Sequence, residues 1–202
     1  KIIDLACGTG FATRLLQEKY NVPCTGVDFS DGMIRVARSK NTTDCNFVRS
    51  DIITYLESLE TESVDVITCC WGLGYSYPRK VIREIARVLK PGGTLAIIDN
   101  SLFSLREIIS TSARTFFGHP SQLQCLMKFR FLLGRKHCVA IMRRYGFKKH
   151  ASWSGRKSFF TSSGTDALRK LTASAAAAGF EYSVHPANTI EGYSRFAGLL
   201  ER

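Results

Sequence analysis

The chain has 202 residues, of which 45% are hydrophobic, and a formal net charge of +11. This length suits one globular domain with a sizeable core. No stretch approaches the roughly eighteen consecutive apolar residues of a membrane-spanning helix, and the start lacks the layout of a secretory signal. We therefore expect a soluble, intracellular protein of the cytoplasm. Because the chain opens within an apolar run and without Met, we also expect residues to precede it.

Apolar runs alternate with helical patterns, which is typical of a parallel sheet wrapped by helices. Strands are predicted at 1–6, 24–29, 45–51, 64–70 and 94–100. Helices are predicted at 12–20, 31–39, 79–89 and 165–178. Residues 180–186 and 194–200 predict two closing antiparallel strands. The fold class is thus an α/β, Rossmann-like doubly wound sheet, mostly parallel with an antiparallel C-terminal strand pair. We expect a single domain over 1–202, with an insertion at 101–163 after the fifth strand.

The cysteines are odd in number and include no CxxC pair, which argues against a disulfide framework and against a zinc site. They are Cys7, Cys24, Cys45, Cys69, Cys70, Cys125 and Cys138. We interpret them as small core residues, and we expect no metal site.

Gly8 and Gly10 fall where the first predicted strand ends and a helix begins. Glycines at such a switch let backbone N–H groups approach a ligand closely, and the N-terminus of a helix favours negative charge. A dinucleotide fingerprint would need a third glycine where this chain has Thr13. The chain also has no G-x-x-x-x-G-K-[ST] loop. The spacing therefore favours a ligand other than a dinucleotide or a P-loop nucleotide.

Two acidic residues follow the next two strands. Asp28 ends the second strand and can accept hydrogen bonds from ribose hydroxyls, while Asp51 follows the third strand and can meet an adenine amino group. A strand-end aspartate alone is about as often a helix cap or turn residue. Together with the glycine loop, the two acids indicate a nucleoside-containing ligand.

These motifs resemble the class I S-adenosylmethionine-dependent methyltransferases, especially the branch that includes ubiquinone and menaquinone methyltransferases. The resemblance runs through about half of the chain, in "DLACGTG", "GVDFSDGMIRVAR", "RSDI", "SVDVITCCWGLGY" and "REIARVLKPGGTLAIID". It implies S-adenosylmethionine as cofactor and S-adenosylhomocysteine as product. The missing third glycine agrees with it, because this cofactor carries a carboxylate and a sulfonium in place of a pyrophosphate.

The resemblance also implies a set of cofactor-binding residues, which are Asp4, Ala6, Gly8, Gly10, Asp28, Phe29, Met33, Asp51, Ile52 and Trp71. The two glycines would pass under the methionine part of the cofactor, and Asp4 would hold their loop. Asp28 would bind the ribose and Met33 would pack on the adenine.

At the adenine edge, the resemblance implies a contact from Asp51 and from the backbone of Ile52. Trp71 would lie near the cofactor and the substrate entrance. Nothing from Trp71 to Tyr75 matches the "[DN]PPY" signature of methyltransferases that act on amino groups of DNA or protein glutamine.

A methyl group on a sulfonium is already activated, so positioning an acceptor in line with it is the main catalytic task. A general base is needed only for an acceptor that arrives protonated. The candidates are His119, His137, His150, Tyr75 and Tyr77. Nothing in the sequence selects one, and no catalytic residue is predicted. Asp99 and Asn100 would either contact the substrate or cap a turn.

The whole excess of positive charge lies in one segment. Basic and acidic residues balance in 1–100 and in 161–202, whereas 101–160 holds twelve Lys or Arg and the single acid Glu107. Insertions after the fifth strand commonly cover the active site in the resembling family, so we predict a basic lid over 101–163. Residues 102–110 read as an amphipathic helix, with Leu102, Leu105, Ile108 and Ile109 on one face.

Twelve basic residues against one acid indicate an anionic counterpart. A small anionic acceptor, an RNA face with stacking aromatics, and an anionic membrane surface each fit this charge. Alternatively, the apolar residues of the lid pack onto the sheet while its arginines and lysines remain in water. The resemblance favours transfer of a methyl group to a small organic acceptor by in-line displacement. The alternatives are an RNA, lipid or quinone methyltransferase, a non-catalytic cofactor-binding or scaffold subunit, and an aminopropyl transferase, whose acidic polyamine pocket the lid's charge disfavours. The sequence leaves the oligomeric state open.

Overall fold

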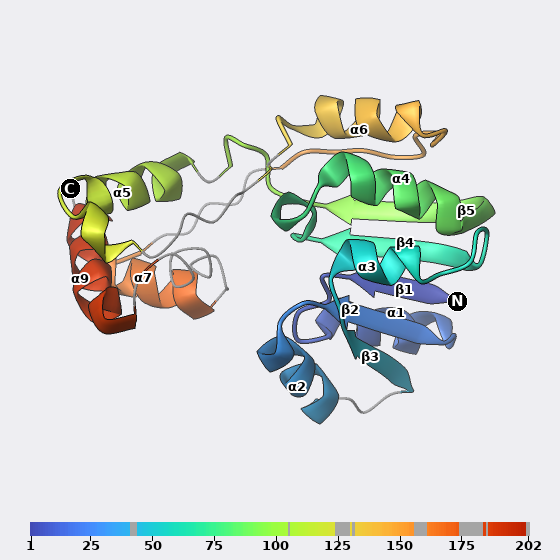
Figure 1. Ribbon diagram of the computed structural model, residues 1–202, viewed down its shortest axis with the longest axis horizontal. Coiled ribbons are helices and arrows are strands. Elements are labelled where there is room, and N and C mark those ends of the chain that lie inside the picture. Colours follow the sequence, from blue (N-terminus) through green and yellow to red (C-terminus); the bar gives the residue numbers. More distant parts are fainter. Residues whose placement is uncertain are drawn as a thin grey trace. The chain divides into compact units, whose positions relative to one another are not determined.

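The computed structural model describes residues 1–40, 44–104, 106–123, 130, 132–155, 161–173, 184 and 186–200 (Figure 1). Its chain forms two compact units. The first unit comprises Lys1–Leu102 and Phe129–Trp153, and the second comprises Phe103–Lys128 and Ser154–Arg202. The predicted insertion therefore contributes to both units, and the prediction of a single domain stays a prediction.

The first unit is built on a five-stranded parallel sheet. Its strands are β1 (Ile2–Leu5), β2 (Cys24–Asp28), β3 (Cys45–Arg49), β4 (Val64–Cys70) and β5 (Leu89–Ile98). They lie in the order β3-β2-β1-β4-β5, so the sheet reverses its direction of growth between β1 and β4. The predicted parallel α/β sheet is confirmed, and each strand overlaps its predicted range.

Helices cover both faces of this sheet (Figure 1). They are α1 (Phe11–Tyr20), α2 (Asp31–Ser39), α3 (Ile52–Glu57), α4 (Pro78–Val88) and α6 (Arg135–Arg144). Alternate residues of β1 point to opposite faces, as strand geometry requires. Ile3 and Leu5 join the core beneath α3, α4 and α6, while Ile2 joins the core beneath α2. The sheet is therefore wrapped on two sides, as in a doubly wound fold.

Local signals set several of these helix ends. Ser30 caps α2, accepting a hydrogen bond from the Met33 amide at 3.3 Å. Pro78 occupies the first turn of α4, where its missing N–H costs nothing. The short helix α3 is absent from the sequence predictions, because six residues are too few to display a helical period.

Strand β5 begins earlier than predicted. Leu89 already pairs with Val64, and the register then shifts so that Thr94 pairs with Val66. The residues Pro91–Gly93 thus form an irregularity within the strand. This fits their chemistry, because Pro91 has no N–H to donate to a neighbouring strand and Gly92 has a positive φ of 80°. The predicted turn thus lies inside the strand.

The second unit contains α5 (Arg106–Phe117), α7 (Gly164–Ala173) and α9 (Thr189–Leu200), with the short 3-10 helices η2 (Pro120–Gln122) and η3 (Pro186–Asn188). The predicted strand at 194–200 is wrong, because this segment belongs to α9. Burial there recurs at helical spacing, with Gly192, Phe196 and Ala197 covered.

Most of the other predicted closing strand lies outside the described residues. Val184 forms one isolated antiparallel bridge with Leu123, so the described part of the chain contains no antiparallel strand pair. The amphipathic helix predicted at 102–110 is also displaced, since α5 begins at Arg106 and buries Thr111, Thr115 and Phe116. Leu105 lies outside the described residues.

Helix α6 belongs to the first unit. Leu132 and Ile141 are buried in the core beneath α4, and Cys138, Met142 and Tyr145 pack against the same core. The part of the predicted lid segment that belongs to the first unit is therefore anchored on the α4 side of the sheet by its apolar residues.

Four cysteines of the described chain are buried, and Cys70 and Cys138 are half-buried; all six are free thiols, as predicted. Burial raises the pKa of the Cys24 thiol to about 11. Cys125 lies outside the described residues. Within the residues described, we find no cluster of three metal-ligating side chains and no helix with the length and apolarity needed to cross a membrane.

A buried carboxylate ties α4 to the end of α3. Glu84, whose side chain is 10% exposed, accepts hydrogen bonds from Arg83 at 3.1 Å and from Arg87 at 2.9 Å. Arg87 in turn donates to the carbonyl oxygens of Leu56 at 2.8 Å and Leu59 at 2.9 Å. Hydrogen bonding from Arg87 holds the pKa of Glu84 below its ordinary value of 4.5. The ionised carboxylate therefore stabilises the fold above pH 4.5 and loses this contribution as the pH falls through the lowered pKa.

We expect Glu84→Gln to lower the free energy of unfolding by about 1–3 kcal/mol at pH 7, because it weakens a charge-assisted hydrogen-bond network. Urea unfolding at pH 7 and near pH 3.5 measures the effect, and the difference from the wild type should shrink at the lower pH. Glu18→Gln, on the exposed surface of α1, is the control. An equal deficit at both pH values would contradict an electrostatic role for Glu84.

Candidate functional site

The predicted site residues gather where the strands end. In a parallel sheet the carboxyl ends of the strands share one edge, and ligands bind there beside the point where strand order reverses. That point lies between β1 and β4. The predicted cofactor-binding residues lie in or beside the loops after β1, β2, β3 and β4, except Asp4, which lies within β1, and Met33, which lies in the first turn of α2.

The loop after β1 has an unusual backbone. Ala6, Gly8 and Gly10 all have positive φ, at 55°, 54° and 75°. Alternating left-handed residues turn successive N–H groups toward one side, a geometry that binds anionic or polar groups. A Cβ built on Gly8 meets no atom within 4 Å, so open space adjoins this part of the loop. The residues present therefore form a cradle that a ligand can approach down to the backbone.

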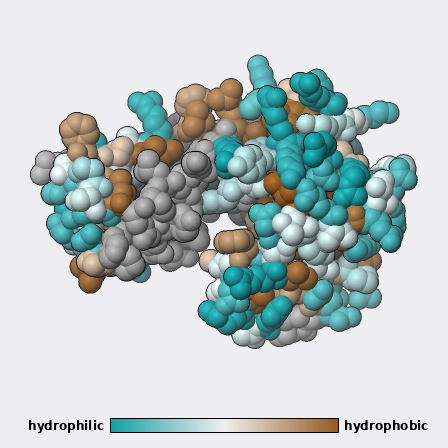
Figure 2. All heavy atoms as spheres, in the orientation of Figure 1, coloured by the Kyte–Doolittle hydropathy of each residue, from teal (hydrophilic) through white to brown (hydrophobic). Residues whose placement is uncertain are grey.

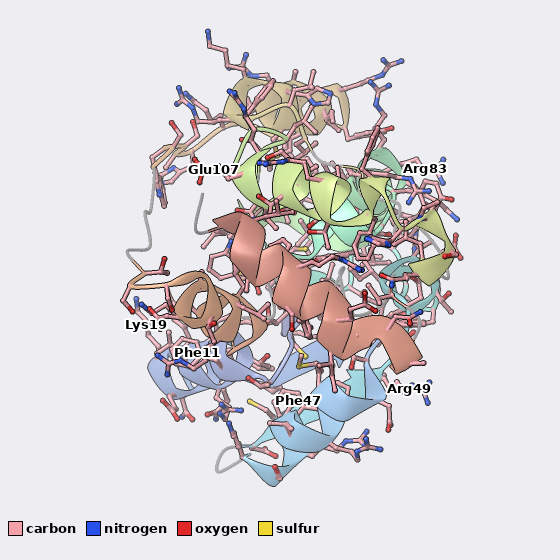
Figure 3. The ribbon with its side chains drawn as sticks, turned by 90° about the vertical axis from the view of Figure 1, so that its left-hand side faces the viewer. Phe11, Lys19, Phe47, Arg49, Arg83 and Glu107 are labelled. Atoms are coloured by element: carbon pink, nitrogen blue, oxygen red, sulfur yellow. The ribbon has the colours of Figure 1, made fainter. Side chains whose placement is uncertain are left out.

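Gly10 is required by packing. A Cβ at this position would lie 2.6 Å from the ring of Phe47, and a Cβ at Gly26 would lie 2.8 Å from the same ring. Figure 3 shows Phe47 between Phe11, the first residue of α1, and Arg49, the last of β3. The buried Phe47 ring thus supports the underside of the glycine loop, and Arg14 holds the loop from α1 by donating to the Thr9 carbonyl at 2.9 Å.

Asp4 is buried beneath the loop, with 2% of its surface exposed. Its two carboxylate oxygens accept hydrogen bonds from the hydroxyls of Thr13 on α1 and Thr68 on β4, both at 2.7 Å. Burial raises the pKa of Asp4, and the two hydroxyls oppose this shift. Asp4 therefore joins β1, α1 and β4, and its geometry fits the expected role of holding the loop.

Asp28 lies at the end of β2, with its carboxylate against the glycine loop. The Gly8 amide donates to Oδ2 at 2.9 Å and the Ser30 amide donates to Oδ1 at 2.8 Å. Each carboxylate oxygen has room for a second hydrogen bond. The side chain is half-buried, so part of this carboxylate is open to a ligand.

The other predicted adenine contacts lie around α2 and α3. Oδ1 of Asp51 caps α3, accepting from the amides of Ile53 at 2.8 Å and Thr54 at 3.2 Å. Asp51 is exposed, while the side chain of Ile52 is buried in the core, so only the backbone of Ile52 is available to a ligand. Met33 is half-buried and Phe29 is 74% exposed.

The ends of β1 and β4 approach each other closely. A Cβ on Gly72 would lie 2.1 Å from the Cβ of Ala6, so only glycine fits there. Trp71 has φ of 55°, and its amide donates to the Ile98 carbonyl at 2.7 Å. Non-glycine residues in this conformation are uncommon and collect at functional sites. Ala6, after β1, and Trp71, after β4, both have this left-handed backbone conformation, and the strand order reverses between these two strands.

Aromatic side chains are exposed in the loops at this edge. They are Phe11, Phe29, Trp71, Tyr75 and Tyr77, each more than half exposed. Tyr75 ends the 3-10 helix η1 (Leu73–Tyr75). Large exposed aromatics gathered in one region indicate a binding surface.

One basic residue of the insertion reaches this edge. The Arg130 amide donates to the Gly74 carbonyl at 2.8 Å, and its guanidinium lies 3.8 Å from the centre of the Tyr77 ring. Stacking on an aromatic face holds a guanidinium in place while leaving its donors free to bind a carboxylate or phosphate.

Asp99, at the end of β5, accepts from the amides of Asn100 at 2.7 Å and Gly74 at 3.3 Å. Burial raises its pKa. These hydrogen bonds hold the 3-10 helix η1 in place and so position Tyr75. Of the two roles predicted for Asp99, substrate contact and turn capping, they fit turn capping.

Two of the three candidate histidines lie on or after α6, and the third belongs to the second unit. His137 accepts from the Leu133 amide through Nδ1 at 3.2 Å on α6, His150 is exposed after α6, and His119 belongs to the second unit. The described contacts single out none of them as a base.

Sequence reasoning missed several contributors to the site, among them Arg14, Phe47, Thr68, Gly72 and Arg130. Gly72 carried a usable signal, as a glycine two residues after a predicted strand. Phe47 looks like any core residue, and the place of Arg130 depends on a contact between segments that lie far apart in the sequence.

Comparison with known proteins agrees with this geometry. Residues 3–97 match the family model described as a methyltransferase domain. The demethylmenaquinone methyltransferase of Thermotoga maritima is 38% identical over 101 residues, which cover 49% of this chain and 43% of that protein. The malonyl-[acyl-carrier protein] O-methyltransferase of a Paenibacillus species is 31% identical over 132 residues, which cover 61% of this chain and 47% of that protein. The chain thus spans less than half the length of these curated relatives.

A structure titled a putative sarcosine dimethylglycine methyltransferase, from Galdieria sulphuraria, superimposes with a TM-score of 0.59. It covers 98% of this chain and 71% of that one at 18% identity, and this likeness shows the fold. Residues 3–97 thus match a methyltransferase domain and resemble the quinone methyltransferases, and these likenesses support a class I S-adenosylmethionine-dependent methyltransferase with S-adenosylmethionine as its cofactor.

Proposed function

We propose that the protein transfers the methyl group of S-adenosylmethionine to a small organic acceptor that carries a negative charge. The observation that carries methyl transfer is the pairing of Gly8 with Asp28. The open cradle beside Gly8 admits a ligand down to the backbone, and the Asp28 carboxylate lies within hydrogen-bond distance of the same amide. A ribose held by Asp28 would lie directly beside the loop.

The roles of the other cofactor residues follow from their places. Gly8 and Gly10 would line the methionine part, and Asp4 would keep the loop in shape from below. Met33 and Phe29 would cover the adenine, while Asp51 and the Ile52 backbone would meet its edge. When bound, S-adenosylmethionine supplies a methyl group activated by the positive sulfonium. The chain's own task is to orient the acceptor and exclude water.

Arg130 supports an anionic acceptor. Its guanidinium is stacked on Tyr77 beside the end of β4, where Trp71 and Tyr75 expose aromatic surface. A fixed guanidinium next to aromatic walls suits an organic acid or phosphate. A relative that acts, by its name, on a malonyl group agrees with this choice.

A quinone ring is the second candidate acceptor. The exposed aromatics Trp71, Tyr75 and Tyr77 suit a planar apolar ring, and the name of the Thermotoga maritima relative is that of a demethylmenaquinone methyltransferase. In that case Arg130 would serve only to hold Tyr77.

Calorimetric titration with S-adenosylmethionine and S-adenosylhomocysteine tests the proposal, and we expect both to bind. Formation of S-adenosylhomocysteine with a panel of small acids and quinols then identifies the acceptor class. Arg130→Met should raise KM for an anionic acceptor by roughly 10- to 100-fold, the worth of a charged hydrogen bond, with little change in kcat. Turnover of quinols alone, unaffected by Arg130→Met, would favour the second candidate. Absence of binding by the full-length protein would contradict methyl transfer.

A further inference from the structure

The segment from Arg130 to Trp153 in the first unit is rich in positive charge and contains no acid. Its basic residues are Arg130, Arg135, Lys136, Arg143, Arg144, Lys148 and Lys149. Apart from Arg130, they lie on α6 or on the stretch that follows it, and all of these are exposed. Figure 2 shows hydrophilic side chains projecting over α6, and Figure 3 shows their nitrogen-bearing ends pointing away from the helix. We call Lys136, Arg143, Arg144, Lys148 and Lys149 the α6 basic surface.

The α6 basic surface is unpaired within the described part of the chain. None of its five side chains forms an ion pair with a described residue. Elsewhere in the first unit, Lys80, Arg87 and Lys90 each have a carboxylate partner, at 2.8, 2.9 and 2.8 Å. Five unpaired cations on a single surface create a potential that attracts a polyanion.

A hollow of about 160 Å³ lies beside this surface, between α4 and α6. It is lined by Arg79, His137, Ala140, Ile141, Arg144 and Tyr145. Guanidinium, imidazole and phenol groups are donors suited to phosphate oxygens. The hollow therefore brings Arg79 and His137 next to the exposed cations.

An exposed aromatic is held next to the same surface. Arg135 donates through Nη1 to the carbonyl oxygen of Ser152 at 3.2 Å and to its hydroxyl at 3.4 Å. This contact ties the end of the segment back to the start of α6. The next residue is Trp153, which is 79% exposed. A basic path with an aromatic platform is the usual arrangement for binding single strands, because bases stack on the ring while cations contact phosphates.

The apolar residues of α6 argue against a membrane as the partner. Helices that lie in a membrane surface expose an apolar face to the lipid. In α6, Ile141 is buried, and Cys138 and Met142 pack against the core beneath α4. The outward side carries Lys136, Val139, Ala140 and Arg143, and Val139, its largest apolar group, is half-buried.

We propose that α6 and the segment that follows it bind single-stranded nucleic acid, with phosphates on the α6 basic surface and a base stacked on Trp153. This role goes beyond the proposed methyl transfer and does not depend on it.

Fluorescence anisotropy with a labelled RNA of about 20 nucleotides and mixed sequence, which is longer than one single-strand binding site, tests the proposal on the full chain. We expect binding that weakens as salt rises from about 50 to 200 mM. The double variant Arg143→Glu/Arg144→Glu should bind at least roughly tenfold more weakly and should lower the slope of log K against log salt by about 1.4, the share of two phosphate contacts. Trp153→Ala should lose roughly five- to tenfold with an unchanged slope, because it removes stacking alone.

Lys19→Glu/Lys40→Glu is the matched control, since it makes the same change of charge at the far ends of α1 and α2, on the other side of the sheet. Equal losses in the two double variants would overturn the proposal in favour of a net-charge effect. Absence of RNA binding would overturn the proposal too. So would binding to phosphatidylserine vesicles, if it is tighter than RNA binding and is abolished by the Arg143→Glu/Arg144→Glu change. Unchanged thermal unfolding of each variant shows that the fold is kept. Titration with S-adenosylmethionine separately reports on the cofactor site, so that failure of the two proposals can be told apart.

Discussion

Replacing Asp28 with alanine is expected to weaken S-adenosylmethionine binding by roughly 10- to 150-fold, or about 1.5–3 kcal/mol. Two losses combine in this variant. The carboxylate that would accept the ribose hydroxyls disappears, and the Gly8 amide loses the acceptor that it contacts at 2.9 Å. Calorimetry on the purified chain measures the change in affinity.

Asp28→Asn separates the two losses. Its amide oxygen can still accept from Gly8, although its NH2 group then faces the Ser30 amide. The glycine loop should therefore keep its support while the charged acceptor is lost, and we expect an affinity between those of the wild type and Asp28→Ala. Asp44→Ala removes an exposed carboxylate beside the amino end of β3, at the opposite edge of the sheet, and should bind normally. An unchanged affinity in Asp28→Ala would contradict the ribose assignment, and an equal loss in Asp44→Ala would reduce the effect to net charge.

The parallel sheet could be predicted from the sequence because its signals are local. Each strand is a short apolar run, and the helix signals Ser30 and Pro78 act within a few residues of the ends that they set. The prediction of a strand at 194–200 was wrong because it, too, used local signals alone. A short run such as Ser194–Leu200 fits either period, and the helix is decided by burial of Phe196 and Ala197 in the second unit, which the sequence does not display.

Some residues of the candidate site could likewise be predicted from local signals, and others could not. Gly8, Gly10 and Asp28 could be predicted, because glycines at a strand end and an acid after the next strand form a recognisable pattern in the sequence. The support beneath them could not, because it depends on contacts across the sheet. Phe47 lies under Gly10 only because β3 pairs with β2 in a register that places it beside Gly26. Thr68 is more than sixty residues from the Asp4 carboxylate to which it donates.

The two glycines of the loop should respond differently to the same substitution. Gly8→Ala places its methyl group in open space, so the loss of stability should be only the roughly 1–2 kcal/mol of left-handed strain. The methyl would occupy the cradle, and we expect S-adenosylmethionine binding to fall by at least roughly tenfold through the loss of close backbone approach. Gly10→Ala adds a contact of 2.6 Å with the Phe47 ring to the same strain, and should lower the free energy of unfolding by about 2–5 kcal/mol.

A double-mutant cycle tests the cause of the Gly10 effect. Phe47→Leu alone should cost about 1 kcal/mol or more through the cavity that it leaves, yet it removes the ring atoms that the new methyl would meet. Urea unfolding should therefore show that Gly10→Ala/Phe47→Leu loses less stability than the sum of the single changes. Additive losses would mean that Phe47 does not set the need for glycine at position 10. Normal cofactor affinity in Gly8→Ala would mean that the ligand does not pass over Gly8, because a methyl group in the cradle would then leave binding unaffected.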